Sequence, residues 1–123
     1  MTRFLSTANK GSFVDAAAYY STALHELAHW TGHPSRLDRN LGRRFGGSAY
    51  AMEELTAELG AAFLCAHCRI DGRLQHASYI SSWLDVLQRD KRAIFVAAAQ
   101  AQKAADFLLA RTTQATGAEA LAA

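Results

Sequence analysis

Proline, cysteine and β-branched residues are scarce in this chain of 123 residues. It contains one proline and two cysteines, and valine and isoleucine together supply only six positions. Strands favour β-branched and aromatic residues, so this scarcity argues against a β-sandwich or a barrel. The cysteines, Cys65 and Cys68, are too few for a disulfide framework, which indicates a reducing, cytoplasmic location.

Long hydrophobic runs and a strong charge of one sign are also missing. Charges interrupt the apolar stretches before about 18 residues, which predicts that no helix spans a membrane. Residues 1–9 contain one arginine and no apolar segment, unlike a secretory signal. The net charge of +2, from 13 basic and 11 acidic side chains, is too small to indicate nucleic-acid binding by itself.

Alanine is abundant, with 26 residues, and it is the best helix former. Half of the residues are hydrophobic and a fifth are charged, which is typical of a folded chain. The length corresponds to about one domain. We therefore expect one mainly α domain of about four helices, with a small sheet or none.

Apolar periodicity and stop signals predict where the helices lie. Residues 32–49 hold four of the eight glycines and the only proline, which predicts a loop. The expected domain covers residues 15–111, between a flexible lead-in at 1–14 and a flexible tail at 112–123. Its four helices are expected at about 15–31, 49–68, 76–88 and 91–111.

The first expected helix contains the pattern H-E-x-x-H, formed by His25, Glu26 and His29. Positions i and i+4 lie on one helix face, so both imidazoles can bind one Zn²⁺. Glu26 projects about 100° away around the helix, where it can act as the general base for a metal-activated water. The alternative is an amphipathic helix with two solvated or core histidines.

A catalytic zinc ion needs a third protein ligand, and the second expected helix offers acidic residues at helical spacing. Glu54 can complete a His₂Glu site, although the neighbouring Glu53 is an open alternative. Glu58, one turn further on, can accept the second N–H of a ligand histidine and fix its tautomer. The competing interpretation is a solvated acidic turn at a helix start, which explains Glu58 least well.

Three long segments make the chain similar to a known family. They are YYSTALHELAHWTGHPSRLDR, YAMEELTAELGAAFLCA and HASYISSWLDVLQRDKRAIFVAAAQAQKAADFL. Over about residues 15–110 the chain resembles the C-terminal zincin-like metallopeptidase domain of ArdC-type antirestriction proteins, also called polyvalent-protein metallopeptidases, of plasmids and phages. H-E-x-x-H followed by E-x-x-A-E is similar to the gluzincin pattern E-x-x-A-D. By this resemblance Glu54 binds zinc and Glu58 supports a histidine, with Glu58 standing where Asp is commoner.

The resemblance implies a minimal gluzincin-type helical domain that acts as a zinc metallopeptidase with one Zn²⁺ and a protein or peptide substrate. It also implies a two-part design with an N-terminal single-stranded-DNA-binding domain, of which little precedes residue 15. The rival function is a non-proteolytic module that binds DNA or a restriction enzyme and keeps the zinc site structurally. DNA contact would then come from the missing domain or from a basic loop, formed by Arg36, Arg39, Arg43 and Arg44.

Other polar residues have a functional and a structural interpretation. An oxyanion stabiliser can be sought among Tyr50, His76 and Tyr79, although packing is the simpler role for each.

The segment C-A-H-C, which runs from Cys65 to Cys68, is half of a zinc knuckle without a second pair, so buried helix residues are favoured. His33 is expected to be a loop residue or a residue that contacts a ligand, rather than a ligand itself. Small residues can let the two zinc-bearing helices approach closely: Ala28, Ala57, Ala61 and Ala62.

Overall fold

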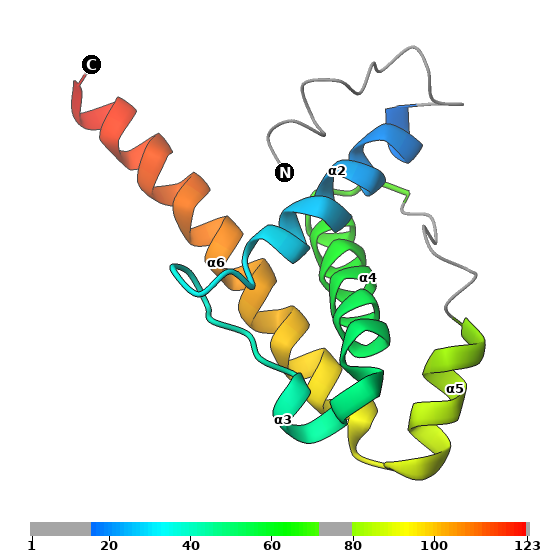
Figure 1. Ribbon diagram of the computed structural model, residues 1–123. Helices are drawn as coiled ribbons and strands as arrows, with labels where there is room; N and C mark the ends of the chain where they lie inside the picture. The colour runs from blue at the N-terminus through cyan, green and yellow to red at the C-terminus, as the bar shows by residue number, and fades with distance from the viewer. Residues whose placement is uncertain (1–15, 72–79, 123) are drawn as a thin grey trace.

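The computed structural model describes residues 16–71 and 80–122, with side chains as far as Thr112. Within these segments the chain is helical and contains no strand (Figure 1). The expected mainly α class is therefore confirmed. The helices are α2 (Ala16–Trp30), α3 (Gly42–Phe45), the 3-10 helix η2 (Gly46–Ser48), α4 (Ala49–His67), α5 (Ile80–Arg89) and α6 (Ala93–Ala122).

The predicted helix ends agree with the structure where local signals are strong. α2 ends at Trp30, and Gly32 follows in a turn. α4 ends at His67, two residues before Arg69, which adopts a positive φ of 58°. The expected helix start at residue 76, like the expected lead-in, lies outside the described residues. The division into lead-in, domain and tail therefore stays a prediction.

The last helix is longer than the sequence signals predict. α6 continues to Ala122, whereas the expected end was Arg111. Alanine recurs through residues 113–122, and its helix propensity continues the helix where the polar composition suggested an end. The predicted end at Arg111 is therefore wrong.

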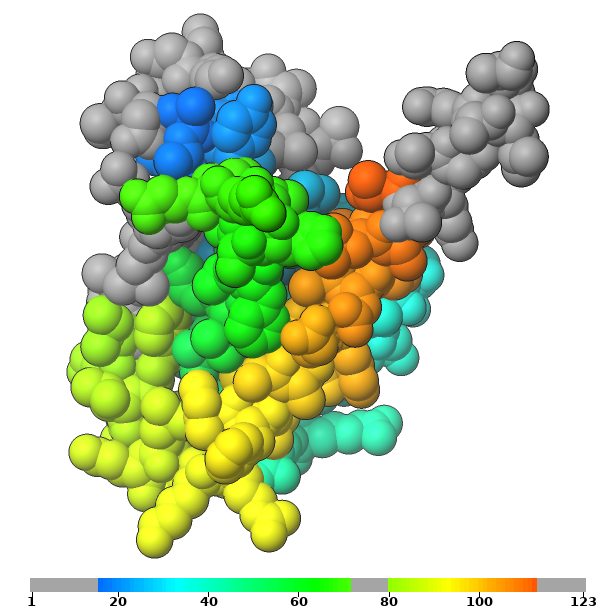
Figure 2. Space-filling view, turned by 180° about the vertical axis from the view of Figure 1, so that it is seen from behind, coloured from blue at the N-terminus to red at the C-terminus, as the bar shows by residue number. Residues whose placement is uncertain are grey.

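α4 is the central helix, since it packs against α2 on one side and α6 on another. Figure 2 shows α6 lying along α4 on one face of the molecule. Small residues permit this packing: a Cβ atom added at Gly60 would lie 3.2 Å from the Ala28 Cβ and 3.9 Å from the Ala104 Cβ. Of the alanines expected between the zinc-bearing helices, Ala28, Ala57 and Ala61 are buried, whereas Ala62 is exposed.

A larger hydrophobic cluster joins α5 to the beginnings of α4 and α6. Met52 and Trp83 are buried in it. The Trp83 indole N–H donates a hydrogen bond to the Ala51 carbonyl at 2.8 Å. This bond satisfies the polar atom of a buried aromatic side chain and fixes α5 against α4.

The segment 32–49, expected to be a loop, contains α3 and η2. Asn40 Oδ1 accepts a hydrogen bond from the Gly42 N–H at 3.1 Å, just where α3 begins. Arg44 binds both carboxylate oxygens of Asp90, at 3.0 and 3.1 Å, and these bonds lower the pKa of Asp90. Side-chain bonds of this kind order a glycine-rich segment that composition alone describes as irregular.

One helix in the described part of the chain meets the length and composition criteria for a membrane span. It is the segment Ala93–Thr112, with a mean hydropathy of 1.2. Lys103 and Asp106 interrupt this segment but leave it within those criteria, so the expectation that no helix spans a membrane stays a prediction. The segment nevertheless packs its buried alanines against α4, and a core helix meets the same criteria.

We expect Gly60→Leu to destabilise the fold by about 1–3 kcal/mol, because its side chain has no room between Ala28 and Ala104. Gly60→Ala should be nearly neutral, since a gain in helix propensity of about 1 kcal/mol offsets the crowding. Urea unfolding measures both. The control is Ala62→Leu at an exposed position of α4. Equal unfolding midpoints for the two leucine variants would contradict the close packing.

Candidate metal centre

The two histidines of H-E-x-x-H lie on the face of α2 that is turned toward α4. Their ring centroids are 4.7 Å apart, with the ring planes at 76°. The His25 side chain is 1% exposed, whereas that of His29 is 23% exposed. His25 therefore lies in the helix interface and His29 at its rim.

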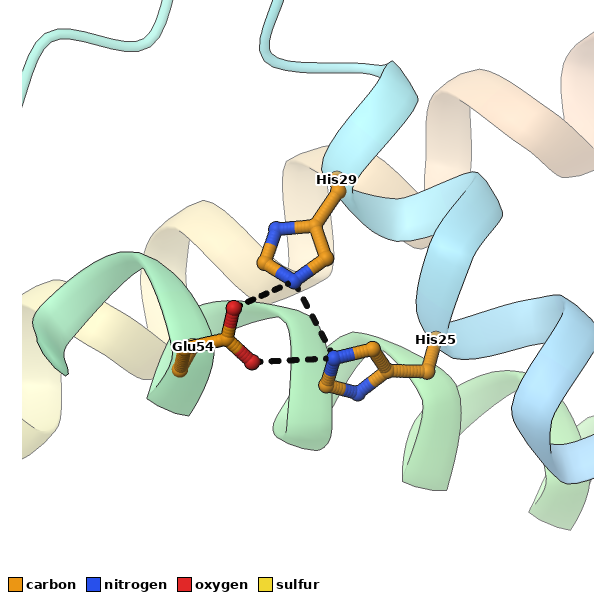
Figure 3. A group of neighbouring side chains, drawn as sticks. All are labelled: His25, His29 and Glu54. Atoms are coloured by element: carbon orange, nitrogen blue, oxygen red, sulfur yellow. Dashed lines mark hydrogen bonds and ion pairs between the residues drawn. The ribbon is translucent and has the colours of Figure 1, made fainter. Parts of the chain in front are cut away.

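Glu54 of α4 points between the two imidazoles (Figure 3). One carboxylate oxygen, Oε2, lies 3.1 Å from His25 Nε2, and the other, Oε1, lies 3.1 Å from His29 Nε2. The two Nε2 atoms are 3.0 Å apart. Three side chains on two helices therefore direct their potential ligand atoms toward one point.

This donor set fits a metal ion. Three ligands of a tetrahedral zinc ion, each about 2.0–2.1 Å from the metal, lie about 3.3–3.4 Å from one another. The distance of 3.0 Å between the two nitrogens, and of 3.1 Å from each nitrogen to one of the two Glu54 oxygens, is close to that spacing. Two facing imidazole nitrogens and a carboxylate also form a ligand set that divalent metals accept. The residues that could hold a metal ion are thus His25, His29 and Glu54.

Glu58 lies on the opposite side of the His25 ring. Its Oε2 atom is 3.3 Å from His25 Nδ1, and its side chain is 8% exposed. A carboxylate at Nδ1 favours the tautomer with the proton there, which leaves the lone pair of Nε2 directed toward Glu54. The structure thus brings Glu58 next to His25, a candidate ligand, and the supporting role of Glu58 stays a prediction.

Glu53 supports the other histidine in the same way. Its Oε2 atom lies 2.8 Å from His29 Nδ1. Arg39 binds the same carboxylate, with Nε 2.7 Å from Oε1 and Nη2 2.8 Å from Oε2. Glu54 therefore contacts the Nε2 atoms of both histidines, whereas Glu53 contacts only the Nδ1 atom of His29.

These contacts shift the pKa values of His29 and Glu53. Burial alone lowers the pKa of His29, but the hydrogen bond with Glu53 and the charges of Glu54, Glu53 and Glu26 raise it above its usual value. Burial alone raises the pKa of Glu53, but hydrogen bonds from Arg39 and His29 bring it below its usual value. Both shifts have the same cause, which is mutual stabilisation of opposite charges in a partly buried group.

Glu26 is half-buried on α2, next to His25 in the sequence. Its negative charge contributes to the raised pKa of His29, so the carboxylate lies within electrostatic range of the candidate site. Tyr50 lies one turn before Glu54 on α4 and is 66% exposed. The other candidate oxyanion stabilisers, His76 and Tyr79, lie outside the described residues.

The predicted basic loop is mostly engaged in internal contacts. Arg39 has a side chain that is 1% exposed, so it does not present its charge at the surface of the loop. Arg36 stacks on Trp30, with the guanidinium carbon 3.9 Å from the ring centroid. Arg44 pairs with Asp90. Arg43 is exposed and, of these four arginines, it alone forms no hydrogen bond or ion pair with a described residue.

Neither the cysteines nor His33 belongs to the candidate site. Both cysteines are free: Cys65 is buried, which raises its pKa, whereas Cys68 is exposed. The expectation of two buried helix residues is therefore half correct. His33 is exposed in the turn after α2, and its Nδ1 atom lies 2.8 Å from Ser35 Oγ.

A family model described as a zincin-like metallopeptidase matches residues 4–100. The chain belongs to this family. Two crystal structures of the antirestriction protein ArdC from the R388 plasmid resemble this zincin-like chain with a TM-score of 0.70, one metal-free at 52% identity and one Mn(II)-bound at 51% identity. Each match covers 80% of this chain and, respectively, 36% and 37% of the ArdC chain. The similarity to ArdC-type proteins and the zincin-like class are thereby confirmed.

Curated relatives of this zincin-like chain carry other names. A protein named DNA primase TraC from Escherichia coli is 53% identical over 103 residues, which is 83% of this chain and 10% of TraC. The uncharacterized protein y4eC of Sinorhizobium fredii is 50% identical over 105 residues, which is 84% of this chain and 34% of y4eC. The chain therefore spans about a third or less of these relatives.

We expect removal of metal to lower the thermal stability of the protein. A metal ion that binds only the folded state, at a free concentration of 100 times its Kd, adds about 2.7 kcal/mol, or about 10 °C in Tm for a domain of this size. Calorimetry of chelator-treated protein, before and after addition of Zn²⁺ or Mn²⁺, measures the shift. A His25→Ala/His29→Ala variant should show no shift, and a metal-independent Tm in the unsubstituted protein would contradict the site.

Proposed function

We propose that this chain is a zinc-dependent metallopeptidase domain of an antirestriction-type protein from a plasmid or phage. Its ligands are His25, His29 and Glu54, its general base is Glu26, and its substrate is a protein or peptide. The observation that carries the proposal is the convergence of two Nε2 atoms and one carboxylate within 3.0–3.1 Å of one another. Membership of the zincin-like metallopeptidase family supports the same chemistry.

Glu54 is the preferred third ligand because its carboxylate faces both inner imidazole nitrogens. Glu53 is less suited, since Arg39 and His29 Nδ1 already share its oxygens. The His₂Glu set leaves a fourth position for water or substrate, as catalytic zinc sites require. The ArdC structure described as Mn(II)-bound supports a metal in this fold, while imidazole-rich sites favour zinc.

The protein side chains divide the work of peptide hydrolysis. When bound, the metal ion supplies Lewis-acid polarisation of the substrate carbonyl and acidifies the attacking water. Glu26 accepts the proton of that water on its carboxylate and passes it to the leaving amine. Glu53 accepts the Nδ1 proton of His29, and the charge of Glu58, 3.3 Å from His25 Nδ1, favours a proton on that nitrogen, so that both Nε2 atoms keep their lone pairs.

A Glu26→Gln variant should lose peptide hydrolysis and keep its metal. The amide has the size of the carboxylate but cannot accept a proton, and loss of a general base costs about 10²–10⁴-fold in rate. Mass spectrometry of a peptide library and of casein measures cleavage, and elemental analysis measures bound zinc.

The matched control is Asp106→Asn, an exposed acid-to-amide change on α6. It should cleave the same peptides at the unsubstituted rate. Retained hydrolysis in Glu26→Gln would exclude Glu26 as the base.

A second candidate function is a non-proteolytic module that binds DNA or a restriction enzyme and uses the metal structurally. The names DNA primase TraC and antirestriction ArdC among the relatives favour it. One local feature also favours it: Arg43 and Lys103 line a polar cavity of about 390 Å³ together with Asn40 and Gln100. Arg39 and Asp38 also line this cavity, so three cations face it beside one carboxylate, and the excess of positive charge can bind a phosphate of a DNA backbone.

For this second function, we expect single-stranded DNA to bind equally to the unsubstituted chain and to Glu26→Gln. Binding should weaken in Arg43→Gln/Lys103→Gln, and its affinity should fall steeply with salt because phosphate contacts release counterions. Fluorescence anisotropy with a labelled oligonucleotide measures both effects. Arg89→Gln, an exposed charge change on α5, is the control. No binding at low salt, or equal loss in the control, would contradict this function.

A further inference from the structure

Arg39 is a charged side chain that is almost fully buried, at 1% exposure. It lies in the segment between α2 and α3, yet its guanidinium is directed back into the junction of α2 and α4. Besides the two bonds to Glu53, it donates to the Ala28 carbonyl at 3.0 Å and to Thr31 Oγ1 at 3.1 Å. Buried charges need such partners, and Arg39 has partners on both metal-bearing helices.

The backbone around Arg39 is shaped to admit the guanidinium. A Cβ atom at Gly32 would lie 2.7 Å from Arg39 Nη2, so a side chain there would force the guanidinium to move. The Arg39 N–H donates to the Gly32 carbonyl at 3.0 Å, which turns the chain back toward α2. Asp38, just before it, adopts a positive φ of 51°. A strained backbone is kept where the surrounding structure requires it, and here the turn at Asp38 directs the Arg39 side chain toward α2 and α4.

Glu53 connects Arg39 to His29, because its carboxylate binds both side chains. Its Oε2 atom accepts from Arg39 Nη2 at 2.8 Å and lies 2.8 Å from His29 Nδ1. A forked guanidinium bond fixes the plane of a carboxylate, as a single ammonium bond does not. Because His29 is at the rim and 23% exposed, its ring depends on such a bond more than the buried His25 does.

We propose that Arg39 is a positioning residue for His29. Acting through Glu53, it fixes the ring orientation and the tautomer of His29, and it thereby sets the affinity of the site for a divalent metal ion. This inference rests on the metal site of the proposed function, but it does not require peptidase activity. A carboxylate that orients a ligand histidine typically contributes about 10–100-fold to metal affinity.

The test is the Zn²⁺ affinity of a set of variants, measured by competition with a chromophoric chelator. Arg39→Gln and Glu53→Gln should each weaken binding by about 10–100-fold. The double variant should bind Zn²⁺ no more weakly than the single variant with the lower affinity, since both changes break the same chain of hydrogen bonds. Arg39→Lys keeps the charge without the fork and should lie between. Arg44→Gln, which removes the exposed pair with Asp90, should bind like the unsubstituted protein.

A second readout separates positioning from general stabilisation. In the zinc-bound protein, ring-nitrogen NMR should detect the His29 Nδ1–H protected from exchange with water, and this protection should fall in Arg39→Gln and Arg39→Lys. If Arg39→Gln does not fold, Glu53→Gln and Arg39→Lys decide the question. Folded variants with unchanged zinc affinity and unchanged protection would overturn the role of Arg39 while leaving the ligand set intact. Absence of zinc binding in the unsubstituted protein would overturn both.

Discussion

Carboxylates of α4 buried against imidazoles of α2 are the constraint on which the rest of the structure depends. Glu54 and Glu58 are 7% and 8% exposed, and a charged group in such a place is costly unless it is paired. Their partners are the ring nitrogens of His25 and His29, so the two helices must keep one register. A shift of a single residue along α4 would rotate both acids by about 100° and leave four polar side chains without partners.

The buried alanines between the helices follow from this register. Contacts of about 3 Å between Glu54 and the two histidines hold α2 and α4 at a fixed separation, and where their backbones approach closely the residues between them must be small. Gly60 and Ala28 meet this requirement on the α2–α4 side, and Ala104 meets it where α6 covers the same helix. Exposed Ala62 does not serve this purpose, so the requirement explains the buried alanines only.

The sequence predicts those parts of the site that follow from helical spacing. His25 and His29 are four positions apart, as are Glu54 and Glu58, and both pairs face one interface as expected. Helical spacing does not predict the contact between Arg39 and Glu53. That contact depends on a turn with a positive φ at Asp38 and on Gly32, whose lack of a side chain leaves room for the guanidinium. Composition likewise did not predict the end of α6, where the helix propensity of alanine continues the helix among polar residues.

The loop arginines illustrate why charge counted along a sequence overstates charge presented at a surface. Four positive side chains in nine residues suggest a basic patch, yet Arg39 is neutralised internally by Glu53 and Arg44 externally by Asp90. Arg36 is stacked on Trp30, which leaves Arg43 as the exposed cation of the four without a partner among the described residues. An electrostatic attraction for nucleic acid would therefore depend on the combined positive charge of Arg43 and of Lys103 on α6, which line the same cavity. The segment after α2 contributes mainly to the junction of α2 and α4, because its most buried charge, Arg39, contacts residues of both helices.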